Sequence, residues 1–206
     1  MAELERLLDF LKIAGKLKTT LRYSELNLDA RRESTADHSW RLSLMVFMVC
    51  QELSLDLNVH KAMKIALVHD LAESLTGDID ALVIARGEIS IEEKNIGELQ
   101  AMTKIKNILS KDTGKEVFEL WQEYEKGVTE EAKFVKALDK LETITQLIEL
   151  GYKVYDAPDF IPTYADKHIE KFPKLVPMLN IIKIKLKAEY KKGNLKWKKS
   201  YNKFLK

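Results

Sequence analysis

Residues 66–78 concentrate groups that can bind a metal or transfer a proton. An apolar run ends there in the doublet His69-Asp70, which is followed by Glu73 and Asp78. Burying charged groups beside an apolar run is costly unless they are paired or bind a metal. One divalent ion could neutralise these carboxylates and accept the imidazole lone pair. The segment therefore indicates a metal centre near the end of a helix.

Two further residues could complete such a centre. His38 lies near the start of a long apolar segment, and Asp139 lies at the edge of an apolar stripe. Two histidines and two aspartates suit Mn, Co, Fe, Ni or Zn, and Mg where water completes the coordination shell. Asp139 could instead pair with Lys136 or Lys140. Glu73 could be either a salt-bridge partner or a general acid or base.

The remaining histidines and the single cysteine do not fit the pattern of a site. His60 begins a helix and His168 stands among charged residues, so both are expected in solvent. Cys50 lies in an apolar run and is expected to be a buried thiol. Because no activated serine or cysteine accompanies the cluster, direct attack by water is a simpler hypothesis than a covalent intermediate.

The composition favours helix almost everywhere. The 206 residues include only 8 glycines and 4 prolines, and Leu, Lys, Glu, Ala and Ile dominate. One all-α domain is predicted, with a metal-site core at about residues 20–150 and a C-terminal helical extension at about residues 160–206. Hydrophobic periodicity predicts helices over residues 2–18, 36–53, 59–69, 79–86, 90–109, 115–126, 130–150 and 163–192.

Several residues predict where these helices begin or break. Thr35, Asn58 and Thr129 are the residue types that cap helix N-termini. A proline, Pro173 or Pro177, is expected to interrupt the last helix.

Apolar residues at helical spacing predict two packed faces. The second helix is expected to bury one face, which consists of Trp40, Leu44, Phe47 and Met48. A C-terminal amphipathic helix is expected to pack its aromatic residues on the domain or on a second subunit, namely Trp197, Tyr201 and Phe204.

The charge balance argues against nucleic-acid and membrane partners. The net charge is +2, so bulk attraction to polyanions is not implied. The longest apolar run, residues 44–50, is far shorter than the roughly 20 residues that span a bilayer. The N-terminus lacks the apolar core of a signal peptide. A cytoplasmic protein is expected, with DNA binding by the lysine-rich residues 183–206 as a minor alternative.

The order His38, His69-Asp70, Asp139 resembles the H…HD…D signature of the HD-domain metal-dependent phosphohydrolase superfamily. Within it, residues 4–155 resemble the HD-domain 5′-deoxynucleotidase family. The matching segments are residues 31–41, 69–78 and 137–142. A bare HD doublet is a weak signal, whereas the HD-x-x-E-x-x-x-GD extension with DHSW upstream is specific.

The resemblance implies an HD-domain helical bundle with a metal site at its centre. One divalent ion would be bound by His38, His69, Asp70 and Asp139. Co²⁺, Mn²⁺ or Mg²⁺ is expected, and Zn²⁺, Ni²⁺ or Fe²⁺ would also fit. Family members are commonly homodimers, so a homodimer is expected here.

The resemblance also implies roles around the metal. Glu73 and Asp78 would be the acid/base and water-positioning carboxylates, with Asp78 also contacting the substrate, and the two roles could be exchanged. Arg22 falls where the family places a phosphate-binding arginine. Tyr23 stands where a well-studied bacterial member has a tryptophan against the deoxyribose, which leaves discrimination against ribonucleotides open.

The leading hypothesis is therefore a metal-dependent phosphomonoesterase that releases phosphate from deoxynucleoside 5′-monophosphates. An HD-type phosphodiesterase or nucleoside polyphosphate hydrolase would use the same ligand set on different bonds. A non-catalytic nucleotide sensor is a third possibility, but a sensor has no need of Glu73 and Asp78.

Overall fold

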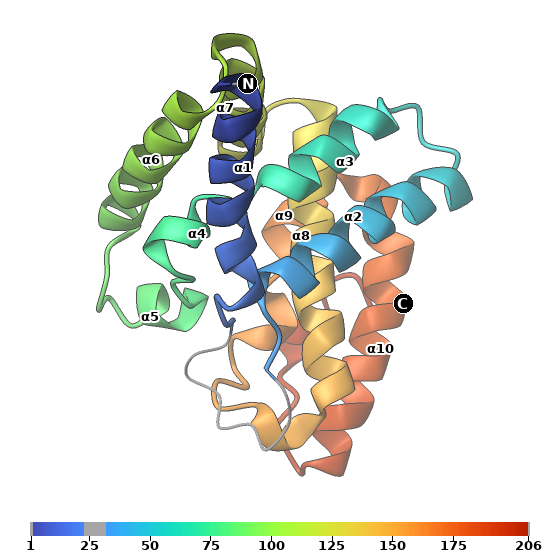
Figure 1. Cartoon of the computed structure of the whole chain (residues 1–206). Helices are drawn as coiled ribbons and strands as arrows, with labels where there is room; N and C mark the ends of the chain where they lie inside the picture. The colour runs from blue at the N-terminus through green and yellow to red at the C-terminus, as the bar shows by residue number, and fades with distance from the viewer. Residues whose placement is uncertain (1, 23–31, 206) are drawn as a thin grey trace.

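The computed structural model describes residues 2–22 and 32–205 (Figure 1). Within these ranges the regular elements are helices and no strand forms, which confirms the all-α prediction. An isolated antiparallel bridge joins Leu21 to Ser34. No helix in this described part of the chain is both long and apolar enough to cross a bilayer.

The predicted helices form in order with shifted boundaries, and the short helix α4 is an addition to them. The predicted helix over residues 163–192 is divided into α9 and α10, and α7 begins at Lys111 rather than at residue 115. The α-helices are α1 (Ala2–Ala14), α2 (Thr35–Glu52), α3 (Val59–Val68), α4 (Glu73–Thr76), α5 (Ala81–Ala85), α6 (Ile91–Ile108), α7 (Lys111–Lys126), α8 (Glu130–Leu150), α9 (Asp166–Lys171) and α10 (Val176–Lys192).

Helix α8 is the central element. Helices α2, α3, α7, α9 and α10 all pack on it, and α1, α4 and α6 form a second group beside this bundle (Figure 1). The larger apolar core lies around α8, where Phe134, Leu138 and Leu141 are fully buried. A smaller core of Met102, Ile105 and neighbouring residues lies under α6 and α7. Residues on the inner face of α8 are thereby held rigidly at the middle of the molecule.

The N-terminus of α2 is capped by Ser34, so the prediction of Thr35 was wrong. The Ser34 hydroxyl accepts a bond from the Asp37 backbone N–H at 3.2 Å, and the Asp37 carboxylate accepts from the Ser34 N–H at 2.9 Å. This reciprocal capping box satisfies two backbone donors. It leaves the Thr35 side chain free to point into the protein. Asn58 and Thr129 cap α3 and α8 as predicted.

Helix α2 buries the opposite face from the predicted one. The inward face consists of His38, Leu42, Val46 and Cys50, at intervals of four residues. The outward face consists of Trp40, Leu44, Phe47 and Met48, all of which are exposed. A buried polar residue in the first turn sets the inward face of this helix, and hydrophobicity alone does not reveal that choice. Cys50 is buried, as expected.

The C-terminal region is broken at Pro173, one of the two predicted positions, but its last segment is not a long helix. Pro173 begins a 3₁₀ turn and Pro177 lies in the first turn of α10. Beyond α10 the chain forms only a short 3₁₀ turn, Lys199–Asn202. Its aromatic residues still pack inward, since Trp197 contacts the rings of Tyr190 and Tyr201 edge-on.

Buried Lys183 fastens this last segment to the bundle. Its Nζ lies 2.7 Å from Asp166 Oδ1 and donates to the carbonyls of Tyr201 and Lys203 at 3.3 and 2.8 Å. A buried ammonium is tolerated because these acceptors replace its water.

Candidate metal centre

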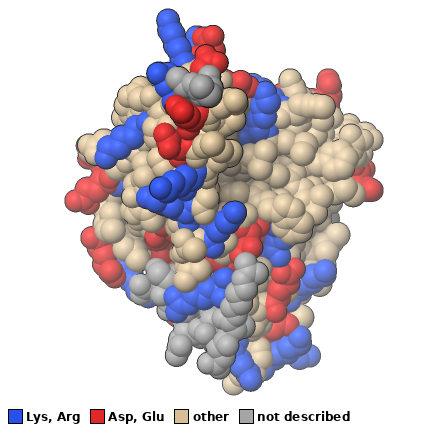
Figure 2. All heavy atoms as spheres, viewed as in Figure 1, with Lys and Arg blue, Asp and Glu red and all other residues tan. Residues whose placement is uncertain are grey.

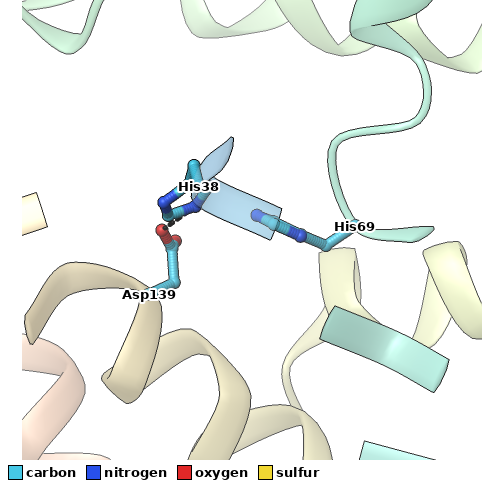
Figure 3. A group of neighbouring side chains, drawn as sticks. All are labelled: His38, His69 and Asp139. Carbon is cyan, nitrogen blue, oxygen red and sulfur yellow. Dashed lines mark ion pairs between the residues drawn. The ribbon is translucent and has the colours of Figure 1, made fainter. Parts of the chain in front are cut away.

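Three helices bring His38, His69 and Asp139 together (Figure 3). His38 lies in the first turn of α2, His69 directly follows α3, and Asp139 lies near the middle of α8. All three are buried, and one ligand atom from each lies within 4.8 Å of the others. His38 Nε2 is 3.2 Å from Asp139 Oδ1.

Asp70 completes the predicted set. Its Oδ2 lies 2.9 Å from His69 Nε2 and 3.8 Å from His38 Nε2. The four residues proposed as ligands from the sequence therefore converge, although they span about 100 positions of the chain.

The other two histidines lie outside this cluster. His60 is exposed, as expected. His168 is half-buried rather than solvated, and burial, with the nearby charge of Lys140, lowers its pKa to about 4. Its imidazole is therefore neutral at physiological pH.

Both clustered histidines turn a buried Nε2 toward the centre. His69 Nδ1 lies 2.8 Å from the Ala66 carbonyl oxygen, and His38 Nδ1 lies 2.5 Å from Glu142 Oε2. These oxygens are acceptors, so Nδ1 is the protonated nitrogen in each ring. Neither Nε2 has a hydrogen-bond partner among the described residues. Two buried lone pairs beside carboxylate oxygens fit a divalent cation, which would bind all of them.

The electrostatics of the cluster also favour positive charge at its centre. Burial lowers the pKa of His38, but its contacts with Asp139 and Glu142 outweigh this and raise it to about 9. Asp139 Oδ2 is held by the Tyr124 hydroxyl at 2.6 Å and by Lys140 Nζ at 2.8 Å. Although burial opposes it, Lys140 with His38 keeps the pKa of Asp139 well below its usual range. Asp139 therefore stays ionised, with Oδ1 left for the cluster.

A cavity of about 350 Å³ opens beside the cluster. Arg22 lines it, with Nη1 at 3.5 Å from Asp70 Oδ2 and Nη2 donating to Thr143 Oγ1 at 3.2 Å. Glu73 and Asp78 line the same cavity. The sequence-predicted residues at positions 22, 73 and 78 are thus all within one pocket.

Glu73 and Asp78 are placed by the short helix α4 and the glycine after it. Glu73 begins α4, is buried, and accepts a hydrogen bond from Thr35 Oγ1 at 2.8 Å. Gly77 has φ of +78°, a left-handed backbone conformation that glycine adopts without strain, and it turns the chain so that Asp78 faces the cavity. Burial raises the pKa of both carboxyls, and for Glu73 the charges of Asp70 and Asp78 raise it further.

Apolar and aromatic side chains also line the cavity. They include Ile79, Leu82, Phe160, Ile161 and Tyr164. Tyr23, which by the family resemblance would lie beside the sugar, is outside the described residues.

Sequence reasoning missed the residues that hold the ligands. Glu142 and Tyr124 each bond to a member of the cluster. Glu142 carried a usable signal, because it lies three residues after Asp139 and so shares its helix face. Tyr124 carried none, because only the packing of α7 against α8 brings it close.

The fold and the cluster define a helical protein of the metal-dependent phosphohydrolase type. A family model described as HD domain matches residues 14–170, and the chain belongs to that family. Its relatives include the 5′-deoxynucleotidase HDDC2 of Homo sapiens, 36% identical over 178 residues that cover 84% of this chain and 83% of the human protein. The namesake in Dictyostelium discoideum is 42% identical over 148 residues, covering 69% and 76%.

Solved structures share the fold. A predicted metal-dependent phosphohydrolase from Magnetospirillum magnetotacticum MS-1 superposes with a TM-score of 0.76 at 24% identity, covering 94% of this chain and 96% of that one. A conserved hypothetical protein from Pyrococcus furiosus superposes with a TM-score of 0.66 at 28% identity, covering 85% and 98%. The family model and the curated relatives confirm the HD-domain resemblance found in the sequence, and the solved structures share the fold.

Proposed function

We propose that the chain is a 5′-deoxynucleotidase that hydrolyses deoxynucleoside 5′-monophosphates to deoxynucleosides and phosphate. The observation that carries this proposal is the buried cluster, in which two Nε2 atoms have no hydrogen-bond partner among the described residues, beside a cavity lined by Arg22, Glu73 and Asp78. Relatives named 5′-deoxynucleotidase, at 36% and 42% identity, support the substrate class.

His38, His69, Asp70 and Asp139 are the proposed ligands of one divalent ion. The nitrogen and oxygen set suits Co²⁺, Mn²⁺ or Mg²⁺, and Zn²⁺, Ni²⁺ or Fe²⁺ also fits. When bound, such an ion supplies Lewis-acid stabilisation of a phosphoryl oxygen and lowers the pKa of a coordinated water.

Arg22 and the apolar and aromatic side chains of the cavity are proposed to hold the nucleotide. The planar guanidinium presents paired donors that match phosphate oxygens. Thr143 and Asp70 hold that guanidinium next to the cluster. The base would pack beside Phe160 and Tyr164, whose ring centroids lie 5.1 Å apart.

Glu73 is proposed to be the general acid, and Asp78 is proposed to position the attacking water. The raised pKa of Glu73 favours the protonated form of its carboxyl, which is the form that a general acid needs to donate to the leaving 5′-oxygen. Asp78 is proposed to orient the attacking water and to contact the substrate. No side chain forms a covalent intermediate in this scheme.

Phosphate release from dAMP and AMP tests the function directly. Metal-stripped protein is supplied in turn with Co²⁺, Mn²⁺, Mg²⁺ or Zn²⁺. Turnover of dAMP well above AMP is expected, because the relatives are named for deoxynucleotides. Equal turnover would retain the phosphatase and discard the sugar specificity. Hydrolysis of only a cyclic dinucleotide or a guanosine polyphosphate would contradict the proposal, and binding without turnover would indicate a sensor.

A homodimer formed through α2 is also proposed. Trp40, Leu44, Phe47 and Met48 lie on one exposed face, and Trp40 alone is 66% exposed. Figure 2 shows a largely uncharged surface over α2 and α3. Apolar surfaces of this kind in a folded protein commonly mark an interface.

Phe47→Glu is expected to convert the dimer into a monomer, because it places a charge within that face. Light scattering after size exclusion should then give the mass of one chain, 23.8 kDa, instead of twice that value. Leu8→Glu, which places the same charge at an exposed apolar residue of α1, is the matched control. Dissociation by Leu8→Glu alone would place the interface on α1, and a monomeric wild type would refute the proposal.

A further inference from the structure

Glu142 and Asp139 face opposite nitrogens of the same imidazole. They lie one turn apart on α8, with Asp139 Oδ1 at 3.2 Å from His38 Nε2 and Glu142 Oε2 at 2.5 Å from Nδ1. His38 and Glu142 are both completely buried. Because an ionised carboxylate can only accept, it keeps the proton on Nδ1. The Nε2 lone pair is thereby directed at the cluster.

Arg41 holds Glu142 in this position. Its Nε and Nη2 lie 2.6 and 2.5 Å from Glu142 Oε1. The same guanidinium donates to Gln146 and Glu149, each at 2.6 Å, so three side chains of α8 fix it. Both nitrogens reach the same carboxylate oxygen, and charge-assisted hydrogen bonds of this kind are strong. Glu142 Oε1 therefore accepts from Arg41, and Oε2 accepts from His38.

The two histidines are held by partners of different strength. His69 donates to the neutral carbonyl of Ala66, whereas His38 donates to a charged carboxylate. A carboxylate behind an imidazole makes the opposite nitrogen a better metal ligand than a carbonyl does. We propose that Glu142, held by Arg41, is a positioning residue that fixes the tautomer of His38 and strengthens divalent-metal binding at the cluster. This inference rests on the proposed metal role of His38.

A second cation at the Nδ1 side is the competing explanation. Glu33, His38 and Glu142 also present ligand atoms within 4.8 Å of one another. Two guanidinium groups already supply positive charge there, since Arg22 lies 3.4 Å and Arg41 3.7 Å from the carboxylate of Glu33. A cation at Nδ1 would also have to displace its proton. The arrangement therefore favours one ion per chain.

The test compares metal affinity and the His38 tautomer in Glu142→Gln and the wild type. Metal-stripped full-length protein is titrated with Co²⁺ against a chromophoric chelator. The variant is expected to bind about 10- to 100-fold more weakly, because a glutamine amide no longer enforces the donor at Nδ1. ¹⁵N spectra of metal-free protein, recorded at a pH above about 9 where the His38 imidazole is neutral, should show His38 protonated at Nδ1 in the wild type and a loss of that single tautomer in the variant. Glu130→Gln, at an exposed position on the same helix that is remote from Arg41, should leave both readouts unchanged.

The outcomes separate this inference from the proposed function. Wild-type Co²⁺ affinity and tautomer in Glu142→Gln, with only a lower melting temperature, would make Glu142 a packing partner and overturn the inference. Two ions per wild-type chain would also overturn it. A wild type that binds no Co²⁺ would remove the metal centre itself. Should Glu142→Gln fail to fold, Arg41→Gln leaves the carboxylate unclamped, and unchanged Co²⁺ affinity in that variant would overturn the inference as well.

Discussion

Replacing His69 with alanine is expected to abolish tight Co²⁺ binding and to lower dAMP turnover by about a thousandfold or more. His69 is buried, and its Nε2 lies 2.9 Å from an oxygen of Asp70 and has no hydrogen-bond partner among the described residues. Its removal takes away one of two nitrogen donors. Metal assistance contributes several kcal/mol to transition-state stabilisation, and about 4 kcal/mol corresponds to a thousandfold in rate. Metal content by mass spectrometry and phosphate release are the two measurements.

His60→Ala is the matched control for this variant, because His60 lies exposed at the other end of the same helix. It should retain both the metal and turnover. Circular dichroism checks that each variant folds. Unimpaired turnover in His69→Ala, with the helical signal intact, would contradict the proposed metal centre.

The parts of the site that lie close together in the sequence could be predicted from it. His69, Asp70, Glu73 and Asp78 are separated by at most nine positions, so one helix end and one turn bring them near each other. Asp139 could be placed because an apolar stripe with a charged residue at its edge indicates an inward helix face. These predictions depend on local geometry, which the chain specifies over a few residues.

The parts that depend on helix packing could not be predicted. The rotation of α2 is an example, since Trp40 has the hydrophobicity of a core residue but lies on the outside. The buried face is set by His38 and its partner Glu142, which lie 104 residues apart. Tyr124 likewise reaches Asp139 only because α7 packs on α8. Contacts of this kind form only in the tertiary fold, and hydrophobic periodicity does not predict them.

Glu73→Gln is expected to lower dAMP turnover by about 10²- to 10⁴-fold while leaving one metal ion bound. This range is typical of removing a positioned general acid or base. Burial, together with the charges of Asp70 and Asp78, raises the pKa of the Glu73 carboxyl well above its ordinary value. The raised pKa favours the protonated, proton-donating form of the carboxyl, and wild-type turnover should fall as the pH rises through that pKa. Glu116→Gln, at an exposed position on α7, should leave turnover unchanged.

The leaving group distinguishes the roles of Glu73 and Asp78. The 5′-oxygen of a nucleoside leaves as a poor alkoxide and needs a proton, whereas p-nitrophenolate leaves readily without one. If Glu73 is the acid, Glu73→Gln should lose far more activity on dAMP than on p-nitrophenyl phosphate. Asp78→Asn should then impair both substrates alike, because attack by water is common to them. The reverse pattern would exchange the two roles, and equal losses in both variants on both substrates would exclude general-acid catalysis by either carboxyl.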